Sequence, residues 1–184
     1  MDISQTAPQT LILAEDEASL YLQATTAAVW APRGQTPIVR VHPNRKKVNF
    51  YGTLNLHTGK TVATRAEKMN GAATACHLER VLATYPDVPI LLLWDRAKWH
   101  GGPAVRALLQ AHPRLEVMRF PTAAPDLNPQ EMVWKATRAA ISHNHDERHL
   151  TSLADRFEQH LESTTFCYSM LEKYDHDRLC AMFN

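Results

Sequence analysis

The distribution of apolar and polar residues along the chain predicts a domain in which strands and helices alternate. Short apolar runs are typical of buried strands, whereas apolar residues three or four positions apart are typical of a helix with one buried face. Two apolar runs predict buried strands, at Leu11–Ala14 and Ile90–Trp94, and Leu115–Phe120 is predicted to form a further short strand. Between the first two, the alternating segment Val48–Leu56 predicts a half-buried strand, and a turn at His57–Lys60 pairs it with Thr61–Ala66 in a hairpin.

Helices are expected between and after these strands. Residues with helical spacing (Leu78, Val81, Leu82 and Tyr85) predict the first helix, which Pro86 ends. A second is predicted to begin at Gly102-Pro103, a third to run from Asn128 to about Ser142, and a last amphipathic helix carries Leu150, Leu153, Phe157 and Leu161. The Pro-rich stretches Trp30–Pro37 and Pro121–Pro129 predict loops.

The order of these elements predicts the class of fold. A hairpin followed by strand–helix alternation is typical of a mixed sheet with helices on both faces. Residues 1–9 are expected to form a loose tail and residues 10–184 one domain, a size that can bury a substantial core. In such sheets active sites gather near the C-terminal ends of the central strands, so the residues at those ends are the first candidates for chemistry.

Composition narrows the possible functions only slightly. The chain is 45% hydrophobic and 21% charged, which is typical of a globular protein, and it shows no segment resembling a membrane span or a secretory signal. Its three cysteines are widely spaced, which fits a reducing cytosol and argues against disulfides and a CxxC zinc site. Zinc is also not favoured at His143, His145 and His149, which lack a companion cysteine or carboxylate pattern.

Two aspartates, Asp16 and Asp95, are predicted to end apolar strands. A single aspartate at such a place usually does no more than end its strand in water. Two on adjacent strands are more informative, because like charges held close raise each other's pKa unless a cation neutralises them. Mg²⁺ prefers carboxylate oxygens and leaves positions for water and phosphate, so a metal site is the functional alternative.

Glu131 is the third candidate acid, and its position allows two interpretations. Asn128, Pro129 and Glu131 would be the N-cap, first and third residues of a helix, which is close to a capping box. Glu131 would then only bond the backbone N–H of Asn128. The first turn of a helix also points its side chains at the loop edge of the sheet, so the two roles are compatible.

Five segments resemble, in order, the motifs of DDE transposases of the Tc/mariner superfamily, in particular the bacterial insertion sequence 630 family. Phe120–Lys135 (FPTAAPDLNPQEMVWK) is similar to P-x-x-x-P-D-L-N-P-x-E-x-x-W, and Leu91–His100 (LLLWDRAKWH) to an apolar strand followed by D-x-x-x-x-H. Leu11–Leu22 resembles the first motif, an apolar strand followed by Asp-Glu. Trp30–Pro37 (WAPRGQTP) and Val48–Gly59 (VNFYGTLNLHTG) fit W-x-P-x-G and V-N-x-x-G-x-x-N-x-x-T-G.

The resemblance implies a ribonuclease-H-like fold with a mixed five-stranded sheet. It places the catalytic, metal-binding triad on Asp16, Asp95 and Glu131, and the 35 residues between the last two suit the family's spacing. The implied cofactor is Mg²⁺, with Mn²⁺ as a substitute, at two ions per site. One ion would activate water or a DNA 3′-hydroxyl and the other would stabilise the leaving oxygen, with Asp16 bridging them.

DNA is the implied partner, although the net charge of +1 predicts only weak binding by this chain. The residues expected to contact DNA are Arg40, Arg45, Lys46, Lys47, Arg96, Lys98, His100 and Lys135. For His100 a structural role at the start of a helix is equally compatible with the sequence. Arg96 replaces the small polar residue of the family, so it could pair with Asp95 or bind phosphate. Glu17 should point to the opposite face from Asp16 and is expected to be structural.

The implied activity is cleavage of DNA at transposon ends and joining of the 3′-OH ends to target DNA. The family's helix-turn-helix module has no counterpart in these residues, so a partner chain or a homo-oligomer is expected in the active complex, in the cytoplasm at the nucleoid. The alternatives are a stand-alone nuclease of the same fold and an inactive fragment that binds or inhibits. The sequence identifies neither the inverted repeats nor the host element.

Overall fold

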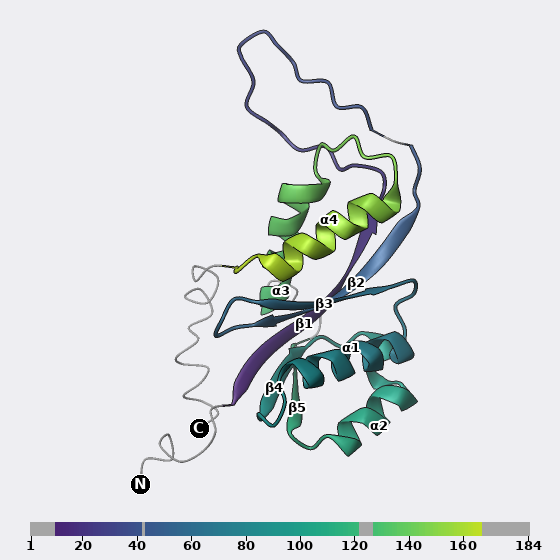
Figure 1. The fold of residues 1–184 in the computed structure, drawn as a ribbon, viewed down its shortest axis with the longest axis vertical. Helices are drawn as coiled ribbons and strands as arrows, with labels where there is room; N and C mark the ends of the chain where they lie inside the picture. The colour runs from purple at the N-terminus through teal and green to yellow at the C-terminus, as the bar shows by residue number, and fades with distance from the viewer. Residues whose placement is uncertain (1–9, 42, 122–126, 167–184) are drawn as a thin grey trace.

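The computed structural model describes residues 10–41, 43–121 and 127–166, which form a five-stranded mixed sheet in the order β3-β2-β1-β4-β5 (Figure 1). Its strands are β1 (Leu11–Tyr21), β2 (Lys47–Asn55), β3 (Thr61–Ala66), β4 (Ile90–Trp94) and β5 (Leu115–Arg119). The first three strands pair antiparallel, and β4 and β5 are parallel to β1. The predicted mixed five-stranded sheet is confirmed, with β1 at its centre.

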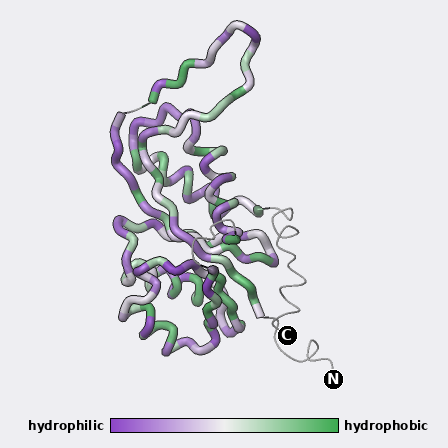
Figure 2. Tube along the Cα trace, turned by 180° about the vertical axis from the view of Figure 1, so that it is seen from behind, coloured by the Kyte–Doolittle hydropathy of each residue, from purple (hydrophilic) through white to green (hydrophobic). Residues whose placement is uncertain are grey.

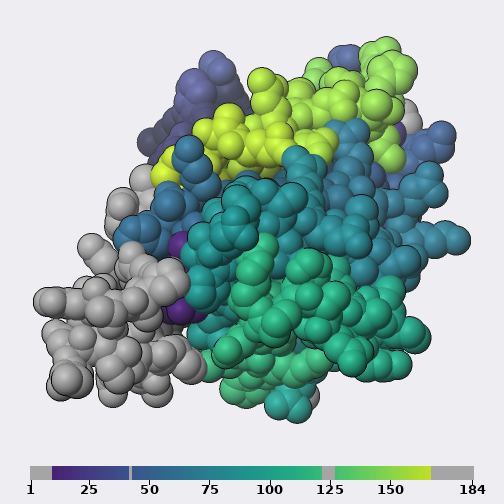
Figure 3. All heavy atoms as spheres, turned by 60° about the horizontal axis from the view of Figure 1, so that its bottom comes forward, coloured from purple at the N-terminus to yellow at the C-terminus, as the bar shows by residue number. Residues whose placement is uncertain are grey.

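Helices cover both faces of the sheet. The helices are α1 (Gly71–Thr84), α2 (Pro103–Ala111), α3 (Pro129–Thr137) and α4 (Leu150–Ser163). Leu78 of α1 and Val105 of α2 belong to the apolar core on one face, while Val133 of α3 and Phe157 of α4 belong to the core on the other. Figure 3 shows the yellow-green α4 on one side of the blue β2–β3 hairpin and the teal and green α1 and α2 on the other, and Arg80 of α1 reaches past the hairpin to pair with Glu162 of α4 at 2.7 Å.

The central strand is longer than the sequence predicted. An apolar strand of four residues was expected at Leu11–Ala14, but β1 has 11 residues and continues through the acidic trio to Tyr21. Its pairing with β4 ends at Ala14↔Leu93, whereas its pairing with β2 continues to Tyr21↔Lys47. Because β2 provides hydrogen-bond partners for the backbone of the polar half of β1, the strand continues past Asp16. Asp16 therefore lies within the strand, whereas the sequence predicted that it would end the strand.

The prediction that β2 is half-buried is wrong. Seven consecutive residues of β2 are buried, because α3 and α4 cover one face and α1 lies against the other. Its buried polar residues are satisfied by side-chain hydrogen bonds. Asn49 accepts from the Ser19 hydroxyl, and Thr53 bonds Nε2 of His77 at 2.7 Å. The alternation of polar residues therefore marks hydrogen-bonding positions and not exposure to water.

The remaining elements lie close to their predicted positions. The expected bounds of β3 and β4 are those observed. The third helix is α-helical to Thr137 and becomes a π-helix at Arg138–Ser142, where it was expected to end. Within the described ranges no helix is long and apolar enough to cross a membrane. The predicted tail, the end of the predicted domain beyond residue 166, and residues 122–126 of the predicted loop lie outside the described residues.

A long arm, residues 22–46, joins β1 to β2 and projects from the body of the molecule (Figure 1). It contains the predicted loop Trp30–Pro37 and mixes hydrophilic and hydrophobic residues (Figure 2). Near its base, Ala27 is held by Asn144 through two hydrogen bonds of 2.8 and 2.9 Å. Farther out, the side chains of Trp30 and Ile38 are almost fully exposed. The arm is thus anchored at its base and presents apolar side chains to solvent.

Candidate active site

Asp16 is a largely buried carboxylate on the central strand. Its Oδ2 accepts a hydrogen bond of 3.1 Å from the indole Nε1 of Trp134, on α3. Burial, and after it the negative charges of Glu131, Glu17 and Asp95, raises the pKa of Asp16 from 3.8 to about 7. An aspartate that holds a proton near neutral pH because other carboxylates surround it is a group that a cation would stabilise in its charged form.

Asp95 directly follows β4 and lies beside Asp16, because β4 is the parallel neighbour of β1. Its Oδ1 accepts from the backbone N–H of Ala97 at 2.8 Å and lies 2.9 Å from Nδ1 of His100. The hydrogen bond to His100 lowers the pKa of Asp95, and Ala97 and Arg119 act in the same direction. Asp95 is therefore ionised, with 46% of its side chain exposed.

Glu131 is exposed in the first turn of α3 and on the same side of the sheet as Asp16, whose pKa it raises. The helix begins as predicted, since the Asn128 side chain accepts from the N–H of Gln130. The Asn128 amide also donates to the backbone oxygen of Glu15 at 2.9 Å, which ties the start of α3 to β1. Among the described residues the Glu131 carboxylate makes no bond to the N–H of Asn128, so the reciprocal half of the capping box is not formed.

Gly52 allows α3 to lie close enough to the sheet for these contacts. It is paired opposite Asp16 on β2. A Cβ at this position would lie 2.6 Å from the Trp134 ring and closer still to the Gln130 amide. The missing side chain therefore makes room for the tryptophan that reaches Asp16.

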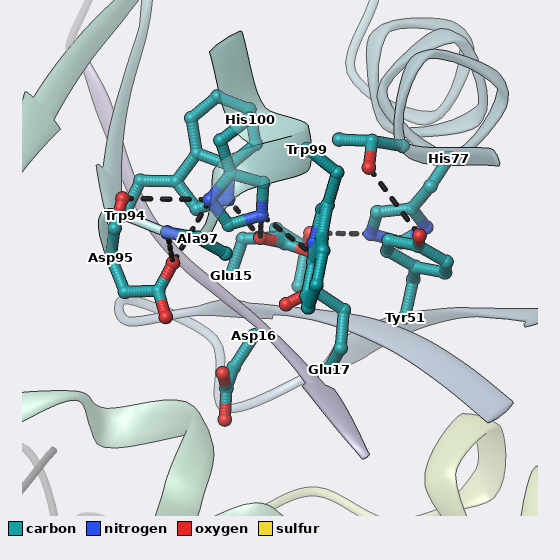
Figure 4. Close-up of polar contacts among 12 residues, drawn as sticks. Glu15, Asp16, Glu17, Tyr51, His77, Trp94, Asp95, Ala97, Trp99 and His100 are labelled. Atoms are coloured by element: carbon teal, nitrogen blue, oxygen red, sulfur yellow. Dashed lines mark hydrogen bonds and ion pairs between the residues drawn. The ribbon is translucent and has the colours of Figure 1, made fainter. Parts of the chain in front are cut away.

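The opposite side of β1 carries a buried cluster of acidic, histidine and tryptophan side chains, from which Asp16 points away (Figure 4). His100 Nε2 lies 2.9 Å from Oε1 of Glu17 and 3.7 Å from Oε2 of Glu15. Trp94 donates to Glu15, and Trp99 donates to Glu17 at 2.5 Å. The expectation that Glu17 faces away from Asp16 agrees with these contacts.

The charge state of this cluster follows from its hydrogen bonds. Burial lowers the pKa of His100, but the hydrogen bonds to Asp95 and Glu17 outweigh it and the net shift is upward. Burial and the neighbouring carboxylates hold the pKa of Glu15 well above its ordinary value. Because the ionised carboxylate of Asp95 only accepts, Nδ1 of His100 donates to it, and the raised pKa of Glu15 favours the protonated form of that group.

The predicted DNA-contacting residues fall into three sets. Arg96, Lys98 and Lys135 are exposed on the segments that carry Asp95 and Glu131. The second set lies at or near the base of the arm and the start of β2, and its side chains are also exposed. Its members are Arg40, Arg45, Lys46 and Lys47. His100 forms the third set, and here the prediction needs correction, because its side chain is fully buried with both nitrogens engaged and cannot reach DNA.

Two ambiguities of the sequence have structural answers. Arg96 donates to the backbone oxygen of Phe120 at 3.2 Å and makes no ion pair with Asp95 in the part of the chain that is described. Of the histidines near residue 145, His145 uses Nδ1 to accept from the N–H of Glu147. The described residues hold one group of three metal-ligand types within 4.8 Å, at Glu15, Glu17 and His100, and none among those later histidines.

Sequence reasoning missed several residues that shape the site. Trp134 was part of a matched motif, and its place three residues after Glu131 on one helical face could have indicated contact with the same neighbours. Gly52 was likewise part of a matched pattern, but only the register of β2 against β1 reveals that it faces Asp16. The contacts of Trp94 and Trp99 with the acidic trio had no signal in the sequence.

Comparison with known proteins identifies the family. The family model described as "DDE superfamily endonuclease" matches residues 12–154. A curated relative, the "Insertion element IS630 uncharacterized 39 kDa protein" of Shigella sonnei, is 26% identical over 152 residues, or 82% of this chain and 44% of its own length. The chain thus spans less than half of that relative.

Solved structures show the same fold. The Mos1 transposase in a paired-end complex with the left transposon end has a TM-score of 0.68 at 17% identity, over 97% of this chain and 56% of its own. The catalytic domain of Mos1 mariner transposase has a TM-score of 0.61 at 16% identity, over 93% of this chain and 80% of its own. The expected ribonuclease-H-like fold, that of a transposase catalytic domain, is confirmed, and the chain belongs to the family of DDE superfamily endonucleases.

Proposed function

We propose that this chain is the catalytic domain of a metal-dependent DNA transposase, which cleaves phosphodiesters at transposon ends and joins the 3′-OH ends to target DNA. The proposal rests mainly on one observation, that the largely buried Asp16 lies on the central strand close enough to Glu131 and Asp95 for their charges, together with burial, to raise its pKa to about 7. Membership of the endonuclease family and the fold of a transposase catalytic domain support it.

Asp16, Asp95 and Glu131 would hold the metal. All three offer hard oxygen ligands, which suit Mg²⁺ and Mn²⁺, and the raised pKa of Asp16 means that a cation would stabilise its charged form. We propose that the three residues together would hold two ions. Mos1 paired-end complexes are described with Mg and with Mn. When bound, the metal would supply Lewis-acid activation of the attacking hydroxyl and stabilisation of the leaving oxygen.

The protein's own residues would position the acids and the DNA. Trp134 fixes one oxygen of Asp16 through the hydrogen bond from its indole N–H. Glu131 is the most exposed acid and lies in the first helical turn, where it can adjust to the ligand. Lys98 and Lys135 are exposed near the acids and would bind the phosphates on either side of the reacting bond.

DNA and a further protein module are the proposed partners. The arm carries exposed Trp30 and Ile38 beyond the basic residues at its base, which suits a contact with a second protein surface next to DNA. We propose that this surface belongs to another copy of the chain or to a helix-turn-helix partner that reads the transposon end in the major groove. The active complex would then assemble on the nucleoid, in the cytoplasm.

Nicking of supercoiled plasmid in Mg²⁺ or Mn²⁺, with and without transposon-end DNA, tests the function. We expect Asp16→Asn, Asp95→Asn and Glu131→Gln each to abolish nicking while leaving the circular dichroism spectrum unchanged. Glu116→Gln, an exposed glutamate on β5, is the matched control and should retain full activity. Cleavage that survives in Asp16→Asn would contradict the proposed role. Nicking without preference for transposon ends would indicate a stand-alone nuclease.

A further inference from the structure

We propose that His100 is a positioning residue that holds the Asp95 carboxylate in its metal-binding orientation and is itself held by Glu17. The inference rests on the proposed metal site and adds to it a group that touches neither metal nor DNA. It replaces the role in DNA contact that the sequence suggested for His100.

The contact with Asp95 is selective for one oxygen. Oδ1 accepts both the backbone N–H of Ala97, at 2.8 Å, and the His100 ring, at 2.9 Å. Among the described residues Oδ2 has no hydrogen-bond partner, and the Asp95 side chain is 46% exposed. Fixing one oxygen in this way leaves the other directed outward as a metal ligand.

The ring itself has no freedom to turn. Its Nε2 is bound by Oε1 of Glu17 at 2.9 Å, and Glu17 is held in turn by the indole of Trp99 at 2.5 Å. The Trp94 ring stacks on the imidazole with centroids 3.8 Å apart. Both nitrogens and one face of the His100 ring are therefore occupied (Figure 4), so that three side chains, those of Glu17, Asp95 and Trp94, set its position.

The place of this link in the sheet explains why it is needed. Backbone pairing between β1 and β4 ends at Ala14↔Leu93, before either strand reaches its aspartate. Beyond that pair, side chains must set the separation of the two strands. The series Glu17–His100–Asp95 runs from β1 to the end of β4 and does so directly behind the proposed metal site.

A metal ion held by Glu15, Glu17 and His100 is the competing interpretation, since their ligand atoms lie within 4.8 Å of one another. Three contacts of this group form without an ion, because Trp94 donates to Glu15, Trp99 donates to Glu17, and the imidazole binds Glu17, while Oε1 of Glu15 has no partner among the described residues. Hydrogen-bonded partners of metal-binding groups typically contribute about 10–100-fold to metal affinity, which sets the expected size of the effect.

Two amide variants of His100 separate these roles. His100→Asn places an amide donor where Nδ1 was and keeps the bond to Asp95, whereas His100→Gln reaches the position of Nε2 and keeps only the contact with Glu17. The whole chain would be titrated with Mn²⁺ alone, and free Mn²⁺ would be followed by electron paramagnetic resonance. His112→Asn, an exposed histidine after α2, is the matched control. Thermal melting of each variant reports folding.

We expect His100→Gln to weaken Mn²⁺ binding by about tenfold or more and His100→Asn by less than about threefold. The proposal would be overturned if both variants lost Mn²⁺ affinity equally and in proportion to their loss of thermal stability. It would also be overturned if His100→Gln bound Mn²⁺ as tightly as the wild type. Loss of one whole ion per chain in both variants would make the histidine a ligand and would also overturn the proposal.

If neither His100 variant folds, Glu17→Gln replaces them and must weaken Mn²⁺ binding at least threefold. Failure of the wild-type chain to bind Mn²⁺, or equal binding by Asp16→Asn, would instead refute the metal site itself.

Discussion

Trp134 Nε1 donates to Asp16 Oδ2 at 3.1 Å, so α3 is tied to the central strand through the carboxylate itself. Trp134 is buried at 1% exposure in the core formed by α3, α4 and the sheet. It lies three residues after Glu131 and therefore on a neighbouring part of the same helical face. The hydrogen bond between Trp134 and Asp16 thus also fixes the distance of Glu131 from the sheet.

Replacing Trp134 by Phe keeps an aromatic ring but removes the N–H donor. We expect a loss of about 1–2 kcal/mol in the free energy of unfolding and a further rise in the pKa of Asp16, because a carboxylate loses its hydrogen bond. Mn²⁺ binding should weaken, and urea denaturation and Mn²⁺ titration would measure the two effects. Trp30→Phe, at a fully exposed position, is the control and should change neither.

Gly52→Ala should separate α3 from the sheet. Its Cβ would lie 2.6 Å from the Trp134 ring, so the helix must move and the bond to Asp16 should break. We expect a destabilisation of about 1–3 kcal/mol together with impaired metal binding. The same change at Gly101, where a Cβ meets nothing within 4 Å, should alter stability by no more than about 0.5 kcal/mol. Similar stabilities for the two variants would contradict the close packing.

The local patterns of the sequence were sufficient for most of the fold, and they singled out the three candidate acids. The uniformly apolar segment Ile90–Trp94 forms β4 at its predicted bounds. A parallel strand that is buried on both faces is a continuous apolar run, so it can be recognised from its own residues alone. The polar half of β1 could not be predicted, since its backbone is satisfied by β2, which comes 26 or more residues later in the chain. His100 was misplaced for a related reason, because its burial depends on Glu17, 83 residues away.

The raised pKa of Asp16 predicts a stability that depends on pH. Between about pH 4 and pH 7 the folded protein keeps a proton on Asp16 that the unfolded chain releases, so stability should fall as pH rises. In EDTA we expect Asp16→Asn to reduce this slope by up to about 1.4 kcal/mol per pH unit. Urea denaturation at several pH values would measure the slope. Added Mg²⁺ should restore stability at pH 7.5 in the wild type alone, and the same slope in both proteins would refute the assignment.

His77 should produce the opposite slope at lower pH. Burial, and then the charge of Arg80, lowers its pKa to about 3, and both ring nitrogens bond threonines, Thr53 and Thr64. The folded protein keeps this ring neutral while the unfolded chain protonates it below about pH 6.5, so stability should fall as pH decreases from there. His77→Gln should flatten that part of the profile in denaturation experiments, whereas His112→Gln, at an exposed position, should leave it unchanged.

Binding of DNA by this chain should be weak, non-specific and dependent on salt. With a net charge of +1 we expect Kd values of about 10⁻⁴–10⁻⁶ M for transposon-end DNA at physiological salt. Replacing Lys46 and Lys47 by Ala should reduce the slope of log K against log salt by about 0.9 for each lost phosphate contact. Gel shifts across salt concentrations would measure this, with Lys60→Ala and Lys68→Ala as the exposed control pair. Nanomolar, sequence-specific binding would contradict it.

The two partners of β1 divide the site between two cooperative units. Asp16 lies where β1 is bonded only to β2, in the hairpin half of the sheet, while Asp95 follows β4 in the parallel half. In amide hydrogen exchange, the residues around Asp16 should open together with the β2–β3 hairpin, and β4 should open with β5. The acids come together only when both units are closed. A partly opened chain would therefore lack the assembled metal site that we propose.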